Sequence, residues 1–179
     1  MLMQGKKGLI MGVANDKSIA WGIAKSLAEN GASIALTYQG ETLKKRVAPL
    51  AETIKSDILI PCDVTDSNSM KNVFETLKEK WGKIDFLVHA IGFSDKDELR
   101  GKYYNTSAEN FNQTMHISCY SFTESCRLVE PLMNEGGSIL TLTYYGAEQV
   151  MPHYNVMGVA KAALEASVRY LAVDLGEKK

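Results

Sequence analysis

The sequence predicts an α/β protein whose doubly wound, mostly parallel sheet is covered by helices on both faces. Short apolar runs alternate with amphipathic helical patterns along all 179 residues, and no linker, repeat or change of composition interrupts them. Strands that are apolar throughout indicate a parallel sheet buried on both faces, and right-handed crossovers then distribute the helices over the two sides. We therefore expect a single domain over residues 1–179 with a Rossmann-like fold.

Five apolar runs of strand length are predicted to form the sheet. The fifth follows Gly136 and Gly137, has β-branched character and reads as a buried strand. The predicted strands lie at residues 7–12, 32–38, 58–62, 84–90 and 138–143.

The first three helices are predicted from helical periods and from residues that begin or end helices. The first, at 18–30, is ended by the glycine that follows it, and the second, at 41–55, is interrupted by Pro49. A third helix is expected at 66–81, where Asp66 can cap its N-terminus.

Two further helices are expected in the second half of the chain. A long polar loop at 94–105 precedes the fourth, for which Thr106 and Glu109 have the spacing of a capping box. This helix is expected to reach about Asn134, and the last helix is predicted at 154–175.

Composition argues against several classes of function. The net charge is −1, no basic block indicates a nucleic-acid partner, and no apolar stretch approaches the ~18 residues of a membrane span. The N-terminus lacks a signal-peptide core, the three cysteines form no CxxC pair, and no His, Cys or carboxylate cluster has metal-ligand spacing. We therefore expect a cytoplasmic protein with no metal site, no nucleic-acid partner and no membrane span.

Small residues follow the first predicted strand, at the edge where open α/β sheets bind ligands. Gly12 opens a loop of such residues before a helix, whose free backbone N–H groups would suit a pyrophosphate, although the spacing is not GxGxxG. Ser18 can either cap this helix or bond a phosphate.

The ends of the next three strands carry further candidates for a dinucleotide. Gln39 stands where such sites usually have an acid for the adenosine ribose hydroxyls. The cations at 44–46 are either a solvated helix face or an attraction for a 2′-phosphate, so NADH is favoured only weakly. Asp63 either meets the adenine amino group or belongs to an ordinary loop, and the small residues Ala90 and Gly92 would let a cofactor approach the backbone.

Tyr154 and Lys161 lie seven residues apart in the last predicted helix. Seven residues turn through about 700°, so both side chains are expected on one helix face. A phenol beside an ammonium, after a strand end that carries Tyr144, makes a proton-donor arrangement; such a pair also arises by chance at helix starts.

Together these stretches resemble the NADH-dependent enoyl-[acyl-carrier-protein] reductases of bacterial type II fatty acid synthesis, a divergent branch of the short-chain dehydrogenase/reductase superfamily. The resemblance covers essentially the whole chain, and its most specific string is Tyr-x6-Lys. Ordinary short-chain dehydrogenases place the lysine four residues after the tyrosine, where this chain has Gly158. The strings that carry the resemblance are GVANDKSIAWG at 12–22, TYQ at 37–39, CDV at 62–64, HAIGF at 89–93 and YNVMGVAK at 154–161.

The resemblance implies a role for each matching position. Tyr154 would bond the substrate carbonyl oxygen, Lys161 would hold the nicotinamide ribose, and Tyr144 would be the second active-site tyrosine. Phe93 would flank the nicotinamide and the acyl pocket. The positions implied to line the NAD cofactor are Gly12, Ala14, Ser18, Ile19, Gln39, Asp63, Val64, Ala90, Gly92 and Lys161.

The resemblance also implies acyl carrier protein as the partner that carries the substrate, and a homotetramer. Family members continue beyond the length of this sequence, so the single domain is expected to lack the C-terminal part usual for the family. Two alternatives stay open. One is a carbonyl or ketoacyl reductase of the same superfamily, against which Gly158 argues; the other is a non-catalytic nucleotide-binding subunit.

Overall fold

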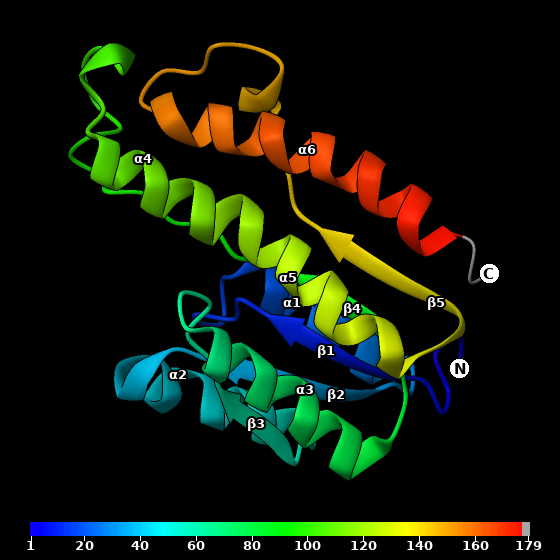
Figure 1. The fold of residues 1–179 in the computed structure, drawn as a ribbon. Helices are drawn as coiled ribbons and strands as arrows, with labels where there is room; N and C mark the ends of the chain where they lie inside the picture. Colours follow the sequence, from blue (N-terminus) through cyan, green and yellow to red (C-terminus); the bar gives the residue numbers. More distant parts are fainter. Residues whose placement is uncertain (177–179) are drawn as a thin grey trace. The chain divides into compact units, whose positions relative to one another are not determined.

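A computed structural model describes residues 1–176 and contains one sheet of five strands, all of them parallel. The sheet order is β3-β2-β1-β4-β5 (Figure 1), and this order reverses at β1 because the chain winds first to one side and then to the other. The doubly wound parallel sheet that the sequence predicts is therefore confirmed. The strands are β1 (Lys7–Met11), β2 (Ser33–Tyr38), β3 (Ile58–Pro61), β4 (Ile84–His89) and β5 (Met133–Thr141).

The chain divides into two compact units. The first comprises residues 1–90 and 128–141 and contains the whole sheet; the second comprises residues 91–127 and the described residues from 142 on. Residues 177–179, over which the predicted single domain also extends, lie outside the described part of the chain. The expectation of one domain over 1–179 stays a prediction.

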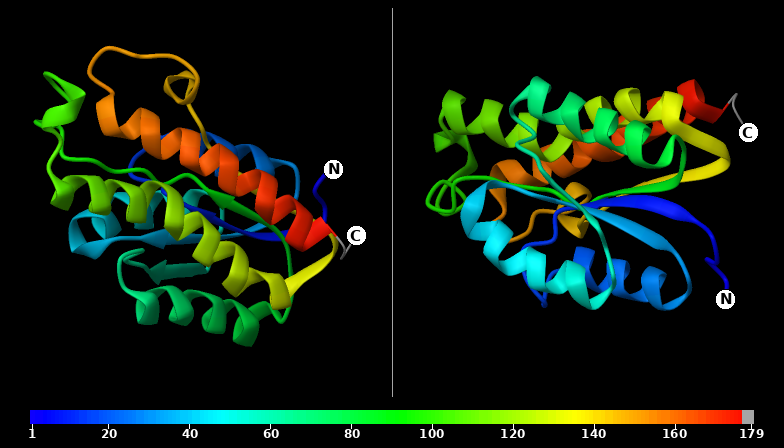
Figure 2. Two further views of the ribbon diagram at one scale, coloured as in Figure 1. Left: turned by 45° about the horizontal axis from the view of Figure 1, so that its top comes forward. Right: turned by 90° about the horizontal axis from the view of Figure 1, so that it is seen from below.

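Helices cover both faces of the sheet within the first unit. Helices α1 (Ile19–Glu29) and α2 (Gly40–Thr53) lie on one face and α3 (Ser67–Trp81) lies on the other (Figure 2). Alternate residues of a strand point to opposite faces, so Leu36 on β2 packs in one cluster with Ala24 of α1 and Val47 of α2. This packing, together with the apolar strands, forms the core beneath the strand ends.

The second unit is built from a long helix and α6. Helices α4 (Ala108–Met115) and α5 (Ser121–Val129) continue one another through a π-helical turn, η2 (His116–Tyr120). Helix α6 (Asn155–Gly176) contacts both α4 and η2 (Figure 1). A π turn displaces the residues after it relative to a regular helix and is frequent at functional sites.

The structure corrects the prediction for α2. Pro49 does not interrupt this helix, although it removes one backbone hydrogen bond. Val47 and Ala51, on either side of it, are buried and pack against the sheet, and this packing keeps the helix continuous.

The end of the fourth predicted helix and the start of β5 also differ from the prediction. The helix ends at Val129 instead of about Asn134, because a 3-10 turn with Pro131 follows. Strand β5 already pairs with β4 at Met133, and Gly136, with φ of 70°, lies in an irregularity inside the strand. The two glycines therefore form a bulge within β5, whereas the prediction placed them before it.

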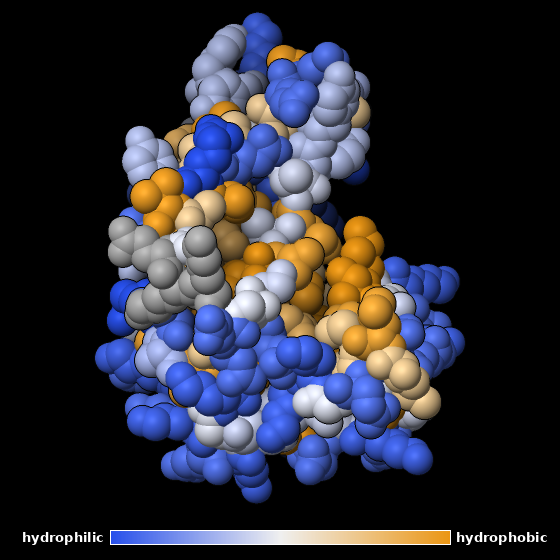
Figure 3. Space-filling view, turned by 90° about the vertical axis from the view of Figure 1, so that its right-hand side faces the viewer, coloured by the Kyte–Doolittle hydropathy of each residue, from blue (hydrophilic) through white to orange (hydrophobic). Residues whose placement is uncertain are grey.

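Strand β5 is not the buried strand that its composition predicts. It forms one edge of the sheet, and most of its residues are exposed. Apolar side chains are visible at the surface on the side of the molecule where β5 lies (Figure 3), and Leu140 on this strand is 49% exposed.

The N-terminus of α4 shows how a local prediction can be wrong by one residue. Ser107 is the N-cap and accepts from Asn110 N, whereas Thr106 and Glu109 were expected to form the capping box. Glu98, far back in the polar loop, accepts from both Ser107 N and Ser107 Oγ. Glu98 thus accepts from the backbone N–H of the N-cap residue, the bond that a capping box would assign to Glu109. These hydrogen bonds hold the polar loop against the start of α4.

Candidate functional site

The candidate residues form two groups, one in each unit, and the group in the first unit lies at the carboxyl ends of the strands. Gly12 follows β1 with φ of 101°, and a Cβ at this position would overlap the Ala90 carbonyl after β4. Only glycine lets these two strand ends approach so closely. Both residues lie at the carboxyl ends of their strands, where the sequence placed them, and the structure adds that these two ends are in close contact.

Ser18 organises the loop before α1. Its Oγ donates to Asn15 O at 2.5 Å and accepts from Ala14 N at 3.3 Å and Asn15 N at 3.4 Å. Ser18 stands at the N-cap position of α1 but makes no side-chain capping bond there, so the structure does not show the capping alternative for its side chain. The first turn of α1 is consequently left without a side-chain cap, and Ile19 at its start is 69% exposed.

This uncapped helix end is the observation that fits the dinucleotide expected from the sequence. Helix N-termini carry unpaired N–H groups and a partial positive charge, both of which suit the pyrophosphate of a dinucleotide. A side-chain cap would have occupied one of these N–H groups. The loop therefore has the chemistry needed for an anionic group.

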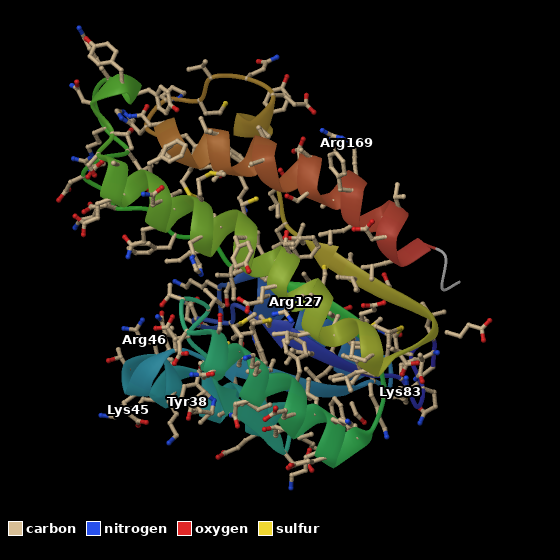
Figure 4. The ribbon with its side chains drawn as sticks, in the orientation of Figure 1. Tyr38, Lys45, Arg46, Lys83, Arg127 and Arg169 are labelled. Carbon is tan, nitrogen blue, oxygen red and sulfur yellow. The ribbon has the colours of Figure 1, made fainter. Side chains whose placement is uncertain are left out.

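Gln39 and Asp63 are brought together although 24 residues separate them. Gln39 Nε2 donates to Asp63 Oδ2 at 3.1 Å. Val64, the next residue, is buried. The cations of α2 lie apart from this pair: Lys45 and Arg46 project into solvent (Figure 4), and Lys44 is 3.5 Å from Glu41 Oε1. The interpretation of 44–46 as a solvated helix face is favoured by these positions.

In the second unit, Tyr144 and Tyr154 form a pair of phenols. Their ring centroids are 4.9 Å apart and their planes are inclined by 69°, an edge-to-face contact. Burial, and next the neighbouring Tyr144, raise the pKa of Tyr154 above its ordinary value. Tyr154 is therefore protonated at neutral pH and can donate its hydrogen.

The backbone around Tyr154 explains why helical spacing alone does not describe the site. Helix α6 begins at Asn155, so Tyr154 itself lies outside the helix, and its carbonyl accepts from Met157 N. Both neighbours have positive φ: 58° at His153 and 35° at Asn155. Asn155 Nδ2 donates to the carbonyls of Glu98 and Gly101, and these bonds hold the unusual conformation in place.

Lys161 is a buried cation with one hydrogen-bond partner among residues 1–176. Its Nζ donates to Leu142 O at 2.8 Å, and no carboxylate of the described residues lies within ion-pairing distance of it. Burial lowers the pKa of Lys161, while Cys119 opposes this shift. An ammonium has three donors, so two remain for hydroxyl oxygens of a ligand.

Gly92 and Phe93 lie against this part of the second unit. A Cβ on Gly92 would be 3.4 Å from Met157 Cε and 3.7 Å from Lys161 Nζ. Ser118, on the π turn, accepts from Phe93 N at 3.0 Å and donates to Phe93 O at 3.1 Å. The Phe93 ring is 49% exposed on a backbone that is held at both polar groups.

Sequence reasoning missed two of these contributors. Ser118 belongs to no recognisable motif and is hydrogen-bonded to Phe93, 25 residues away. The Leu142 carbonyl likewise belongs to no motif and accepts from Lys161, 19 residues away. The π turn that presents Ser118 has no signal in the local pattern.

Among residues 1–176, no group of three or more His, Cys, Asp or Glu is arranged to hold a metal ion. No helix within that part of the chain is long and apolar enough to cross a membrane.

Comparison with known proteins identifies relatives along nearly the whole chain. A family model described as enoyl-(acyl carrier protein) reductase matches residues 12–179. The enoyl-[acyl-carrier-protein] reductase [NADH] 1 of Rhizobium meliloti is 68% identical over 99% of this chain and 65% of its own length. The corresponding NADH reductase of Bacillus subtilis is 51% identical over 98% of this chain and 69% of its own length.

Solved structures lead to the same group. The Anaplasma phagocytophilum enoyl-(acyl-carrier-protein) reductase, crystallised in complex with NAD, superposes with a TM-score of 0.97 at 65% identity and covers 99% of this chain and 68% of that one. The chain spans about two thirds of the length of these relatives.

Proposed function

The chain belongs to the enoyl-(acyl carrier protein) reductase family, and on this premise we propose that it reduces the trans-2 double bond of enoyl groups on acyl carrier protein with hydride from NADH. The observation that carries the proposal is the Tyr-x6-Lys pair: a phenol kept protonated beside a second phenol, and a buried ammonium with spare donors. The named activity of the relatives and the NAD in the Anaplasma complex support it.

In this proposal the residues of the first unit hold the dinucleotide. The uncapped start of α1, with Ser18 and Ile19, accepts the pyrophosphate, while Gln39 takes the adenosine ribose and Asp63 the adenine. Ala14, Val64 and Ala90 line the same strand ends. When bound, NADH supplies the hydride.

The residues of the second unit hold the reacting groups. Lys161 donates to the nicotinamide ribose hydroxyls, with Gly92 allowing close approach and Phe93 flanking the acyl group. Tyr154, assisted by Tyr144, donates a hydrogen bond to the thioester oxygen. As hydride reaches the β-carbon, the electrons of the double bond move toward that oxygen, and a donor aimed at the growing charge stabilises the transition state more than the ground state.

The longer Tyr–Lys spacing fits conjugate reduction. In ketone reduction the hydride is added to the carbon that bears the oxygen, whereas here it is added two bonds away. The proton donor must therefore stand further from the hydride source. The resulting enolate takes a proton from water at the α-carbon, and this hydride and proton together complete the saturated thioester.

The partners and location are part of the same proposal. In this proposal the substrate is carried by acyl carrier protein and the enzyme is a homotetramer. It is located in the cytoplasm, a reducing compartment in which cysteines stay as thiols. The names of the relatives support acyl carrier protein as the substrate carrier, and the three free, buried thiols support a reducing compartment.

The test follows loss of reduced-nicotinamide absorbance with a short trans-2-enoyl thioester, beside a matched β-ketoacyl thioester. Oxidation with the enoyl substrate alone is expected. Oxidation with the keto substrate instead would favour a carbonyl reductase and overturn the Tyr-x6-Lys argument. NADH binding without oxidation of either would favour the non-catalytic nucleotide-binding alternative.

A further inference from the structure

The ends of β2 and β3 place Gln39 and Asp63 next to each other. Tyr38 pairs with Pro61 in the parallel ladder, and Cys62 N donates to Tyr38 O at 2.8 Å. Gln39, which follows Tyr38, and Asp63, which follows Cys62, therefore lie at the same edge of the sheet. Gln39 Nε2 lies 3.1 Å from Asp63 Oδ2.

The chemistry of this contact determines which way the Gln39 amide faces. An ionised carboxylate only accepts hydrogen bonds, so the NH₂ group of Gln39 must point at Asp63. The amide is planar, and its carbonyl oxygen Oε1 is then turned away from Asp63. Gln39 stands at the N-cap of α2 but makes no side-chain capping bond, so no competing bond turns it round.

Asp63 is itself held from two sides. Its Oδ1 accepts from Thr65 N at 2.9 Å and from Thr65 Oγ1 at 2.7 Å. Its backbone N–H donates to Ser69 Oγ at 2.9 Å. The hydrogen bonds of its own loop therefore fix the orientation of the Asp63 carboxylate without a ligand. The carboxylate in turn fixes the orientation of the Gln39 amide through their hydrogen bond.

We propose that Asp63 is a positioning residue that presents Gln39 as a hydrogen-bond acceptor and thereby selects a dinucleotide with an unmodified adenosine ribose. The proposal rests on the dinucleotide binding proposed above and deepens it. The two ribose hydroxyls can donate to Gln39 Oε1. A 2′-phosphate can only accept, so it would meet an acceptor and, behind it, a negative charge.

The nearby cations do not cancel this selection. Lys44 lies 3.5 Å from Glu41 Oε1 and 5.8 Å from the centre of the Tyr38 ring, so its charge is already engaged. Lys45 and Arg46 extend from α2 into solvent (Figure 4), where salt screens them.

The test measures the dissociation constants of NADH and NADPH by nucleotide fluorescence for the intact protein and for Asp63→Asn. Asparagine keeps the shape but removes the charge, and its own amide can donate to Gln39, which lets the Gln39 amide turn its NH₂ outward. The preference for NADH over NADPH is expected to fall by about tenfold or more, the scale of one charged hydrogen bond. The readout is the ratio of the two dissociation constants, because the adenine assigned to Asp63 is common to both nucleotides and its contribution cancels in the ratio.

The matched control is Asp66→Asn, which removes the same charge three residues further on. Asp66 caps α3 through Asn68 N, and asparagine caps helices about equally well, so folding should be preserved. The nucleotide preference is expected to change by less than about twofold. A change as large as that of Asp63→Asn would show that only general charge matters and would overturn the positioning role.

A second comparison separates orientation from charge. In a Gln39→Ala background there is no amide to orient, so Asp63→Asn should alter the preference clearly less than it does in the wild-type protein. An equal effect in both backgrounds would overturn the proposal. An unchanged preference in Asp63→Asn, with NADH still bound by the wild type, would also overturn it. Failure of the wild type to bind either nucleotide would instead contradict the proposed function on which it rests.

Discussion

Replacing Gly158 by alanine tests how closely α6 approaches the turn at Gly146, against which the Tyr154 ring lies. Glycine inside a helix normally costs about 1 kcal/mol relative to alanine, so an unhindered substitution should stabilise the protein by that amount. Here a Cβ would lie only 2.7 Å from Gly146 O. Carbon and carbonyl oxygen ordinarily approach no closer than about 3.3 Å, so helix and turn must separate by roughly 0.6 Å.

The magnitude follows from these two opposing effects. Overpacking of this kind costs about 1–3 kcal/mol, and the gain in helix propensity of about 1 kcal/mol offsets part of it. Gly158→Ala is therefore expected to change the free energy of unfolding by about 0 to 2 kcal/mol in the destabilising direction. The same movement shifts Tyr154, whose ring lies against Gly146, and should lower kcat by about tenfold or more.

The assay is urea unfolding followed by circular dichroism, with Gly22→Ala as the matched control. Gly22 is exposed inside α1, and a Cβ there meets no atom within 4 Å. This control should be stabilised by about 1 kcal/mol, so the two variants should differ by about 1–3 kcal/mol. Equal stabilisation of both variants would refute the close approach of α6 to Gly146.

Three further predictions address the site and the sheet. Tyr154→Phe should lower kcat by about 10²–10³-fold with little change in NADH affinity, because it removes only the donor; a full rate in a thioester assay would contradict its role. Lys161→Met should weaken NADH binding by about tenfold or more, since the ribose loses a charged donor; unchanged nucleotide fluorescence titrations would exclude this. Asp85→Asn should reduce the free energy of unfolding at pH 7 by about 1–3 kcal/mol, because Asp85 accepts from Lys7 N, Lys6 Nζ and Asn134 Nδ2. If urea titrations give this variant the same free energy of unfolding as the wild type, these hydrogen bonds do not stabilise the fold.

The last of these effects has a defined pH dependence. Burial alone would raise the pKa of Asp85, but the hydrogen bonds from Lys7, Asn134 and Lys6, with the charge of Lys6, lower it below 3.8. A depressed pKa in the folded state means that the stabilisation is complete above 3.8 and is lost as the pH falls through the folded value. The difference between wild type and Asp85→Asn should be constant from pH 7 to about pH 5 and shrink only below about pH 4.

The sequence by itself determined which segments form strands and helices and at which edge of the sheet the candidate residues emerge. Apolar runs and helical periods are local signals, and the strands they predict lie within a few residues of β1 to β4. Parallel strands bring all their carboxyl ends to one edge, so Gly12, Gln39, Asp63 and Ala90 could be placed at that edge without coordinates. The Tyr-x6-Lys spacing likewise needed no structure to be noticed.

Only the tertiary structure decided what these residues touch. Gln39 is turned by Asp63, Lys161 is held by the carbonyl of Leu142, and Phe93 is held by Ser118, over separations of 19 to 25 residues. The exposure of β5 has the same origin, because its composition does not state whether a further strand lies beside it. The periodicity of a sequence indicates which face of a helix or strand is apolar. Hydrogen-bond partners that are distant in the sequence depend instead on the backbone geometry at bulges, π turns and residues with positive φ. The local sequence pattern does not predict that geometry.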